Sequence, residues 1–573
     1  MENERTATDN RIEVFFRKAV PIDDPEARYP GFNPGTTILE KGAFHREEAL
    51  PLPCDIIFER DVAVTLRDGT IIYTDIFRPV GGTNLPAIVA WSPYGKGYGW
   101  FSLNRFPGRM GVPRSALSNL EKFEAPDPAY WCNHGYGIVN PDPRGVFMSQ
   151  GDIHFWGAQE AQDGCDLIEW VAAQEWSNGK VALSGNSWLA ISQWFIAAQQ
   201  PPHLAAVAPW EGLSDFYREH GTRGGIPDTG FNDLVISHLY GNGRIEDLST
   251  MIRKYPLMNS YWEEKAANLE KIEVPAYVVA SWTNELHTHG TIDGFRRLSS
   301  RHKWLRVHNT HEWFDYYAAE NVDDLRRFFD RYLKGIENGW EDTPRVRLTV
   351  LDPGGIDQVN RPENDFPLVR TRYQPLYLDA STGRLLPDPV TYESAIRYKT
   401  DNKGQADFTI RFNQNTELTG YMKLRLWVEG DGADDMDLFA FVQKLDTDGN
   451  FVPAFVLGAP SFGANGRLRV SQRELDPVRS TLAEPYLAHI KEELLSPGQI
   501  VPVEIPIWPT GMLWHAGEQL RVVVTGHNLA GRHIPGLPEP TLRNKGEHII
   551  HTGGRYDSHL LVPVIPKGSP TGA

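Results

Sequence analysis

The stretch that decides the fold is Ser184-Gly185-Asn186-Ser187-Trp188-Leu189, which lies between the apolar run Val181–Ser184 and the helix-like stretch Leu189–Gln199. The apolar run is typical of a buried strand. A serine at a strand-to-helix turn occupies the position of a nucleophile elbow, where its hydroxyl projects at the carboxyl end of a sheet. Gly185 allows the sharp turn, and the start of the helix offers the Trp188 amide to a developing oxyanion.

This elbow motif is incomplete in one position. Leu189 stands where the common G-x-S-x-G pattern has its second glycine. Taken alone, Ser187 is therefore also compatible with a serine that caps a helix after a tight turn. The choice between a nucleophile and a cap depends on the rest of the chain.

Short apolar runs alternate with helix-like stretches on both sides of this turn. A β-hairpin comes first, because Val62, Val64 and Leu66 alternate before the turn at Asp68-Gly69. Buried parallel strands are predicted at Leu85–Trp91, Tyr136–Asn140, Val181–Ser184, Ala205–Pro209, Pro275–Ser281 and Trp304–His308. Helices are predicted at Ala158–Glu175, Leu189–Gln199, Ile292–Ser299 and Val322–Leu333. This alternation predicts a parallel α/β sheet.

Two segments depart from the alternation of strands and helices. After residue 210 the strands stop, and helical pieces follow at Asp233–Leu239, Asp247–Lys254 and Tyr261–Glu270. Because this segment lies between two sheet strands, it predicts an inserted helical cap. Past Pro344 the chain becomes all-β, with short strands separated by Gly, Pro and Asp turns, beginning at Val346–Leu351. That spacing predicts a β-sandwich or jelly roll.

The predicted organisation has four parts. They are an N-terminal extension over residues 1–55, an α/β domain formed by 56–210 and 270–343, a helical cap over 211–269, and a β domain over 344–573. A chain of 573 residues is too long for one hydrophobic core, so several domains are expected on length alone.

The composition bounds the partners and the location. A formal net charge of −17 argues against nucleic acid and against anionic membranes as partners. The three cysteines, Cys54, Cys132 and Cys165, form neither a zinc pattern nor a disulfide framework, which favours a reducing compartment. The N-terminus lacks the apolar region of a secretory signal. We therefore expect a cytoplasmic protein, and the sequence leaves self-association into a homo-oligomer open.

Tyr94 is a second candidate for chemistry, in Ser92-Pro93-Tyr94-Gly95-Lys96-Gly97 after the strand Leu85–Trp91. The loop at this place in an α/β-hydrolase supplies an oxyanion donor, and a phenol can replace a backbone amide there. The alternative is a loop tyrosine that packs beside Pro93. The glycines have the wrong order for a nucleotide-binding fingerprint, so no nucleotide cofactor is expected.

Several of these elements, taken in order, resemble one known family. They are Ser92-Pro93-Tyr94-Gly95-Lys96, Asp142-Pro143-Arg144-Gly145, Ser149-Gln150-Gly151, Glu175-Trp176-Ser177-Asn178-Gly179, Gly185-Asn186-Ser187-Trp188-Leu189, Ser281-Trp282, Leu333-Lys334-Gly335 and Gly517-Glu518-Gln519-Leu520-Arg521. Their order and spacing resemble the cocaine esterase and X-prolyl dipeptidyl aminopeptidase family of α/β-hydrolases. The resemblance implies a helical cap and a C-terminal jelly roll. It also implies Ser187 as nucleophile, with the Tyr94 hydroxyl and the Trp188 amide as oxyanion donors.

The resemblance leaves the acid of the catalytic triad open. The family acid follows a strand in a Gly-Trp-x-Asp type element, which here reads Ser281-Trp282-Thr283-Asn284. Asn284 can accept a hydrogen bond from imidazole but has no charge to stabilise imidazolium. In serine proteases this change lowers turnover by roughly 10⁴-fold. Three interpretations stand: an enzyme with altered chemistry, Glu285 as a substitute acid, or a chain engineered as a trap.

The general base is expected after the last strand of the sheet. In Val307-His308-Asn309-Thr310-His311-Glu312-Trp313 the family spacing favours His311, with His308 as second choice. The order Ser187, Asn284 or Glu285, His311 then matches the order of this fold. His287 and His289 lack a third ligand at a sensible spacing, so no metal site is predicted. One of them instead lines the pocket or caps the helix that begins near Gly290.

These residues predict hydrolysis of a carboxylic ester or amide through an acyl-enzyme on Ser187, without a metal or cofactor. The expected partner is a small-molecule substrate with a bulky apolar group. Two other activities of the same site remain open: cleavage of X-Pro peptides and acyl transfer. A binding or scaffold protein whose triad has decayed at Asn284 is the alternative from another class.

Overall fold

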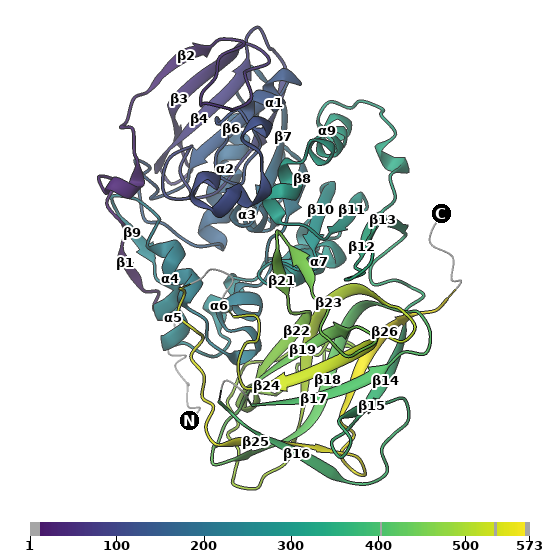
Figure 1. Ribbon diagram of the computed structural model, residues 1–573. Helices are drawn as coiled ribbons and strands as arrows, with labels where there is room; N and C mark the ends of the chain where they lie inside the picture. Colours follow the sequence, from purple (N-terminus) through teal and green to yellow (C-terminus); the bar gives the residue numbers. More distant parts are fainter. Residues whose placement is uncertain (1–11, 402–403, 532–535, 568–573) are drawn as a thin grey trace, which may run out of the picture.

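The computed structural model describes residues 12–401, 404–531 and 536–567, and two large sheets organise it (Figure 1). Each sheet has 11 strands. The first part of the chain, purple to teal in Figure 1, forms one sheet with its helices, and the green to yellow part forms the other. The sequence-based expectation of an α/β part followed by a β part is therefore confirmed.

The first sheet is mixed, with a parallel centre and antiparallel edges. Its strand order is β13-β12-β11-β10-β8-β7-β5-β6-β4-β3-β2. The strands are β2 (Gly35–Leu39), β3 (Ile56–Thr65), β4 (Ile71–Pro79), β5 (Leu85–Val89), β6 (Gly137–Asp142), β7 (Ser177–Asn186), β8 (Leu204–Trp210), β10 (Ala276–Ser281), β11 (Lys303–His308), β12 (Val346–Val350) and β13 (Gln358–Glu363). The strands from β5 to β12 in this order pair in parallel, and β3 and β4 form the predicted hairpin. The carboxyl ends of the central strands thus meet at one edge.

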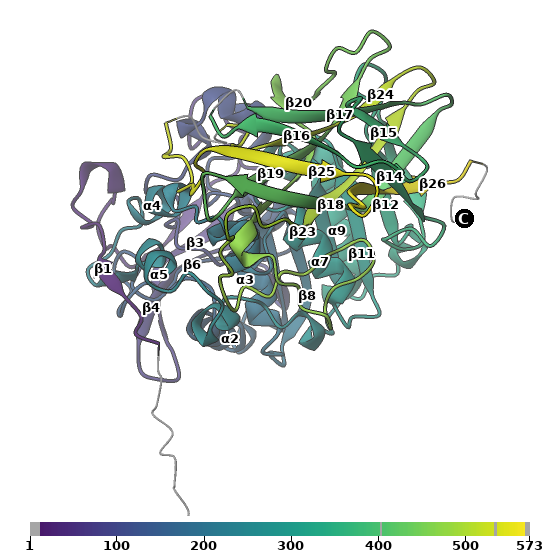
Figure 2. The same cartoon turned by 90° about the horizontal axis from the view of Figure 1, so that it is seen from below.

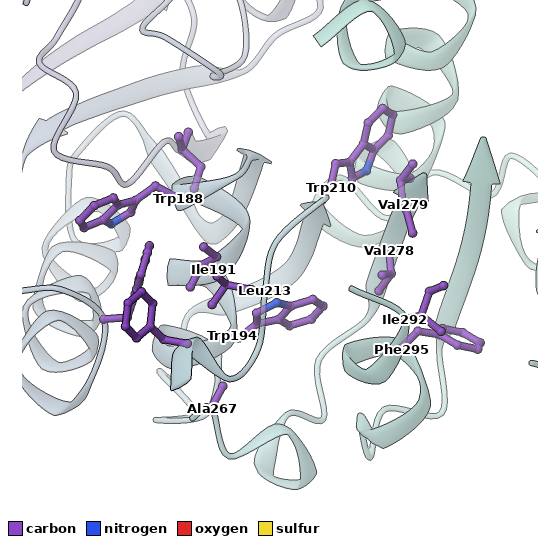
Figure 3. Close-up of a cluster of buried hydrophobic side chains, with 14 of the residues drawn as sticks. Trp188, Ile191, Trp194, Trp210, Leu213, Ala267, Val278, Val279, Ile292 and Phe295 are labelled. Carbon is purple, nitrogen blue, oxygen red and sulfur yellow. The ribbon is translucent and has the colours of Figure 1, made fainter. Parts of the chain in front are cut away.

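Helices pack against this sheet. They are α1 (Pro128–Asn133), α2 (Ala158–Ala172), α3 (Trp188–Ala197), α7 (Thr288–Arg297), α8 (Glu312–Tyr317) and α9 (Ala319–Leu333). Four of them, α2, α3, α7 and α9, lie where the sequence predicted helices, whereas α1 and α8 had not been predicted. Figure 3 shows Ile191 and Trp194 of α3, and Ile292 and Phe295 of α7, in the core beside β10. Burial of each such side chain contributes about 1.5–3 kcal/mol. No helix in the described ranges is both long enough and apolar enough to cross a bilayer.

Short helices interrupt the sheet between β8 and β10. They are α4 (Gly230–Ile236), α5 (Leu248–Lys254) and α6 (Ser260–Glu264), and Figure 1 shows α4 and α5 beside the small β1–β9 sheet. That two-stranded sheet pairs β1 (Phe16–Lys18) with β9 (Arg244–Glu246). The predicted helical pieces are therefore present, although α6 ends six residues earlier than Glu270, where the sequence prediction had it.

The boundaries of the α/β part differ from the prediction at both ends. The strand predicted as the start of the β domain, β12, pairs in parallel with β11, and β13 extends the same sheet to Glu363. The first sheet therefore ends about twenty residues later than position 343. At the other end, β2 lies within the segment predicted as an irregular extension, yet it pairs with β3. Pairing between distant strands decided both boundaries, and local sequence patterns do not specify it.

The second sheet forms the C-terminal β domain. Its order is β16-β25-β18-β26-β14-β15-β17-β24-β19-β22, with β23 paired to β18. The strands are β14 (Arg372–Asp379), β15 (Arg384–Leu386), β16 (Ser394–Lys399), β17 (Gln405–Arg411), β18 (Thr416–Asp431), β19 (Asp437–Leu445), β22 (Ala464–Arg469), β23 (Val501–Trp514), β24 (Gln519–Thr525), β25 (Glu547–Thr552) and β26 (His559–Ile565). A separate hairpin pairs β20 (Ala454–Val456) with β21 (Ala459–Ser461). Figure 2 shows this domain from below, with the paired β16 and β25 in the foreground.

A buried ion pair fixes the loop between β11 and α8. Arg306 Nη1 lies 2.8 Å from Asp315 Oδ1, and Nη2 donates to the other carboxylate oxygen. Burial alone would raise the pKa of Asp315, but the guanidinium charge holds it below its usual value. This pair anchors the loop that carries His308, His311 and Glu312.

We expect Asp315→Ala to lower the free energy of unfolding by roughly 3–5 kcal/mol, because it leaves the Arg306 charge buried and unpaired. Urea denaturation measures the effect. Glu270→Ala is the matched control, since it removes the exposed pair with Arg297, where the side chains are 57% and 41% exposed, and it should cost less than about 1 kcal/mol. Equal effects of the two variants would contradict the role given to the buried pair.

Candidate active site

Ser187 has the backbone conformation of an elbow. It follows β7 with φ 52° and ψ −118°, in a region that costs a non-glycine residue roughly 1–3 kcal/mol and is found mostly at functional sites. Its amide donates to the Glu211 carbonyl at 2.9 Å, which holds the turn. Within the described residues its side chain makes no capping bond to α3. The geometry therefore favours the nucleophile over the helix cap.

The close packing of Leu189 explains why residue 185 is a glycine. Gly185 has φ 139°, and a Cβ there would lie 2.4 Å from Leu189 Cδ2 and 2.8 Å from the Glu124 carbonyl. Only glycine fits this place without a shift of its neighbours. The Leu189 side chain packs directly over the glycine, so the missing second glycine of the motif does not prevent the turn.

The structure places the Tyr94 hydroxyl beside Ser187 and the Trp188 backbone. The Tyr94 hydroxyl interacts by hydrogen bonds with the Ser187 side chain and the Trp188 backbone. Burial, with the charge of nearby Glu124, raises the pKa of Tyr94 well above its usual value. The phenol therefore stays protonated and keeps a proton to donate. Two donors, one phenolic and one from the first turn of α3, thus lie beside Ser187 Oγ.

The histidine beside the serine is His287, and not the predicted His311. His287 Nε2 lies 3.2 Å from Ser187 Oγ, and the residue precedes α7 in the loop after β10. His311 begins α8, where its Nδ1 accepts from the Trp313 amide at 3.2 Å. The second choice, His308, is bound through Nε2 to Glu211 at 2.6 Å. The family spacing pointed to His311 because it was counted only from the last parallel strand of the predicted sheet, whereas His287 follows the strand before it. The expectation that one histidine of the pair 287 and 289 lines the pocket is confirmed.

Asn284 organises the loop that carries His287. Its Oδ1 accepts from the amides of Leu286 at 3.0 Å and His287 at 3.2 Å. Its Nδ2 donates to Glu211 at 2.7 Å and to Glu312 at 3.1 Å. These bonds occupy both ends of the amide. Asn284 is thus a loop cap and a bridge between two carboxyl groups, and its neighbour Glu285 lines the same cavity as Asn284.

Three carboxyl groups lie close to one another at this bridge: Glu124 and Glu211, which are buried, and Glu312, whose side chain is 11% exposed. Glu312 Oε2 lies 4.0 Å from His287 Nε2. Burial and the neighbouring carboxyls raise the pKa of Glu312 well above its usual value, and burial raises the pKa of Glu124 to about 8. Sequence reasoning missed this cluster. One signal was present, because Glu211 and Glu312 follow strands whose carboxyl ends meet at the same edge.

Two cavities adjoin the catalytic residues. The first is small, opens at Ser187 and His287, and has a largely apolar wall. Its lining is Tyr94, Phe155, Trp156, Ser187, Trp188, Ile191, Leu213, His220, Phe231, Asn232, Val235, Leu286 and His287. The second is larger and has Glu211, Asn284, His311 and Glu312 on one wall and the β20–β21 hairpin on another. The serine therefore faces an apolar chamber, while Glu211 and Glu312 face a cavity with both polar and apolar walls.

Comparisons with known proteins agree with this geometry. Residues 68–247 match the X-Pro dipeptidyl-peptidase (S15) family, and residues 338–561 match the C-terminal non-catalytic domain of X-Pro dipeptidyl-peptidases. A cocaine esterase from Rhodococcus sp. is 24% identical over 88% of this chain and 98% of the esterase. A putative Xaa-Pro dipeptidyl-peptidase of Streptomyces avermitilis is 22% identical over 40% of each chain.

A solved structure provides the stronger similarity. The CocE/NonD family hydrolase from Staphylococcus aureus is 39% identical, with a TM-score of 0.84 over 89% of this chain and 94% of that one. Identity at this level over nearly the whole length shows common family membership, and the relatives named above are hydrolases. This chain therefore belongs to the CocE/NonD family of α/β-hydrolases and is a serine hydrolase related to cocaine esterase and the X-Pro dipeptidyl-peptidases.

Proposed function

We propose that the protein hydrolyses a carboxylic ester with a bulky apolar acyl group, through an acyl-enzyme on Ser187. The observation that carries this proposal is the 3.2 Å contact between Ser187 Oγ and His287 Nε2, with the Tyr94 hydroxyl beside the serine. A nucleophile in contact with a base and next to oxyanion donors is the arrangement that acyl transfer requires.

The reaction follows from these positions. Ser187 Oγ attacks the ester carbonyl while His287 Nε2 takes its proton. The Tyr94 hydroxyl and the Trp188 amide stabilise the negative oxygen of the tetrahedral intermediate. His287 then gives its proton to the leaving alcohol, and an acyl-enzyme remains. Water, deprotonated by the same imidazole, attacks the acyl-enzyme. As this second tetrahedral intermediate collapses, His287 returns the proton to Ser187 Oγ and the carboxylic acid is released.

We propose that Glu312, which lies 4.0 Å from His287 Nε2, supplies a carboxyl near the imidazolium, on the side of the nitrogen that faces Ser187. We place the histidine in the loop after β10 and the acid in the loop after β11, so the two have exchanged loops relative to the family order. When His287 becomes imidazolium, its charge favours the ionised form of Glu312, 4.0 Å from Nε2. Asn284 positions His287 and Glu312, because its side chain accepts from the His287 amide and donates to the Glu312 carboxyl.

The chamber beside Ser187 supports an apolar acyl group. We propose that residues 211–269 act as the cap over this chamber, since they contribute Leu213, Phe231 and Val235 to its wall. An aromatic or branched acyl group fits such a surface better than an acetyl group, because apolar contact contributes roughly 25 cal/mol per Å² buried.

The cap's acidic side chains favour an ester over an X-Pro peptide. A peptidase of that kind needs a carboxylate to hold the substrate amine. Glu219 is bound by His289 at 3.0 Å, and Asp215 by Arg218 at 3.0 Å. Because both carboxylates already have cationic partners, they are poorly placed to bind an amine.

Two further expectations stay proposals. We interpret the β domain as a jelly roll on the basis of its long antiparallel strands. We also propose a reducing compartment such as the cytoplasm, on the basis of three cysteines that form no disulfide in the described chain. Small molecules remain the proposed partners.

Labelling with a fluorophosphonate probe tests the proposed function. We expect rapid labelling of the wild type and none of Ser187→Ala, because the probe needs an activated serine. The same protein should hydrolyse p-nitrophenyl benzoate faster than p-nitrophenyl acetate, and both faster than an X-Pro amide. An unlabelled wild type without esterase activity would favour a binding protein instead, and preference for the X-Pro amide would favour a peptidase.

Paired histidine variants test the assignment of the base. We expect His287→Ala to lower kcat by roughly 10³-fold or more, since the serine then lacks a proton acceptor. His311→Ala should lower kcat by less than about tenfold, because the ring caps α8. Steady-state kinetics with one ester measure both. A larger loss of kcat in His311→Ala than in His287→Ala would show that His311 is the base.

The third test concerns Asn284→Asp. This change removes the donor shared by Glu211 and Glu312 and adds a third acidic group between them. Like charges in a buried site destabilise the ionised forms. We expect kcat/KM at pH 8 to fall by at least about tenfold, with a smaller loss at pH 6, where protonation removes part of the repulsion. A gain in kcat at pH 8 would show instead that Asn284 is a degenerate triad acid.

A further inference from the structure

Glu160 lies in the first turn of α2, buried behind the oxyanion donors. One of its oxygens, Oε1, accepts three hydrogen bonds: from Trp91 Nε1 at 2.8 Å, from Trp188 Nε1 at 2.9 Å and from Ser192 Oγ at 3.1 Å. The residue is only 5% exposed. A carboxyl group is costly to bury, so its position needs a reason beyond filling space.

The two indoles come from the two halves of the oxyanion site. Trp91 follows β5 and precedes Tyr94 by three residues, so it fixes where the Tyr94 loop begins. Trp188 carries the backbone amide donor and follows Ser187 (Figure 3). A single oxygen atom therefore links the strand that leads to one donor with the residue that holds the other.

We propose that Glu160 is a positioning residue for the oxyanion site, which sets the distance between the Tyr94 loop and the Trp188 amide. The inference rests on the proposed acyl-enzyme function and deepens it. Catalytic donors are effective only when held within a fraction of an ångström of the developing charge. Glu160 contacts neither substrate nor Ser187, and it acts through the two tryptophans.

The packing around Trp188 transmits this constraint. Its indole lies 4.5 Å from the ring of Trp156, 4.8 Å from Phe155 and 6.1 Å from Tyr94, between ring centroids. If the indole lost its anchor, it would rotate against these rings. Because Trp156 and Tyr94 also line the substrate chamber, a rotated indole would displace an oxyanion donor and part of the wall together.

The protonation of Glu160 makes a neutral side chain a reasonable substitute for it. Burial raises the pKa of Glu160 to about 7, although its three donors and the more distant Lys265 oppose the rise. A substantial fraction is therefore the carboxylic acid at neutral pH. Glutamine has the same shape and keeps an acceptor oxygen, so Glu160→Gln should preserve the bonds to both indoles. Leucine removes the acceptor at similar volume.

The experiment compares Glu160→Leu with Glu160→Gln. We expect Glu160→Leu to lower kcat by about 10²-fold with KM changed by less than about threefold, because the lost geometry matters only in the transition state. Glu160→Gln should keep kcat within about fivefold of wild type. An aryl boronic acid, which mimics the tetrahedral intermediate, should lose affinity for the leucine variant in proportion to kcat/KM. Ser192→Ala, which removes the third donor but neither indole, is the matched control and should retain wild-type kcat.

A second variant keeps the inference falsifiable if the leucine protein does not fold. Trp91→Phe retains an aromatic ring and removes the N–H that Glu160 accepts, together with one ring of the indole, and we expect kcat to fall about tenfold with KM unchanged. Wild-type kcat in Trp91→Phe, or a fall in kcat matched by no loss of boronic acid affinity, would overturn the role of Glu160. Failure of the proposed function has a different signature, because the wild type itself would then resist the fluorophosphonate probe.

Discussion

The site depends on one strained residue at the carboxyl end of a parallel strand. Ser187 adopts a left-handed backbone only because Gly185 leaves room for Leu189 and because the Glu211 carbonyl accepts the Ser187 amide. The same edge of the sheet collects the loops after the neighbouring strands. Tyr94 therefore reaches the serine from the loop after β5 and His287 from the loop after β10. The strained turn places Ser187 at the edge where side chains from several loops meet, an arrangement that no single helix or strand could provide.

Strand pairing explains how the proposed acid and base can lie in exchanged loops. In the parallel register Ser281 of β10 lies beside His308 of β11, so the loops after these strands start at the same level of the sheet. A histidine from either loop can therefore approach the serine, and a carboxyl from the other can stand next to it. Asn284 then has a role that aspartate would not fill, since its amide must donate to Glu312 and accept from the loop at once.

Local patterns predicted the parts of the molecule that local forces determine. The buried strands, most of the helices and the turn at Ser187 have signals within a few residues. Trp188 follows directly from that turn, and Tyr94 from the loop motif after the strand Leu85–Trp91. His287 had no such signal, because its contact with Ser187 spans 100 residues. The placement of β12 failed for the same reason, since its apolar run suits either sheet and only its pairing with β11 decides. The cluster of Glu124, Glu211 and Glu312 was not predicted because its members come from three separate segments of the chain.

The β domain reaches the catalytic region through the helix that begins beside His287. His289, in the first turn of α7, lies with Nδ1 3.0 Å from Glu219 in the inserted segment and Nε2 3.5 Å from Glu484 in the β domain. Burial opposes a charge on this imidazole, yet the two carboxylates raise the pKa of His289 to about 10, so the cation persists through neutral pH. One charged ring thus joins three parts of the chain two residues from His287. Since a shift of either carboxylate would pull on the start of α7, the geometry at Ser187 depends on the β domain as well as on the sheet that carries the serine.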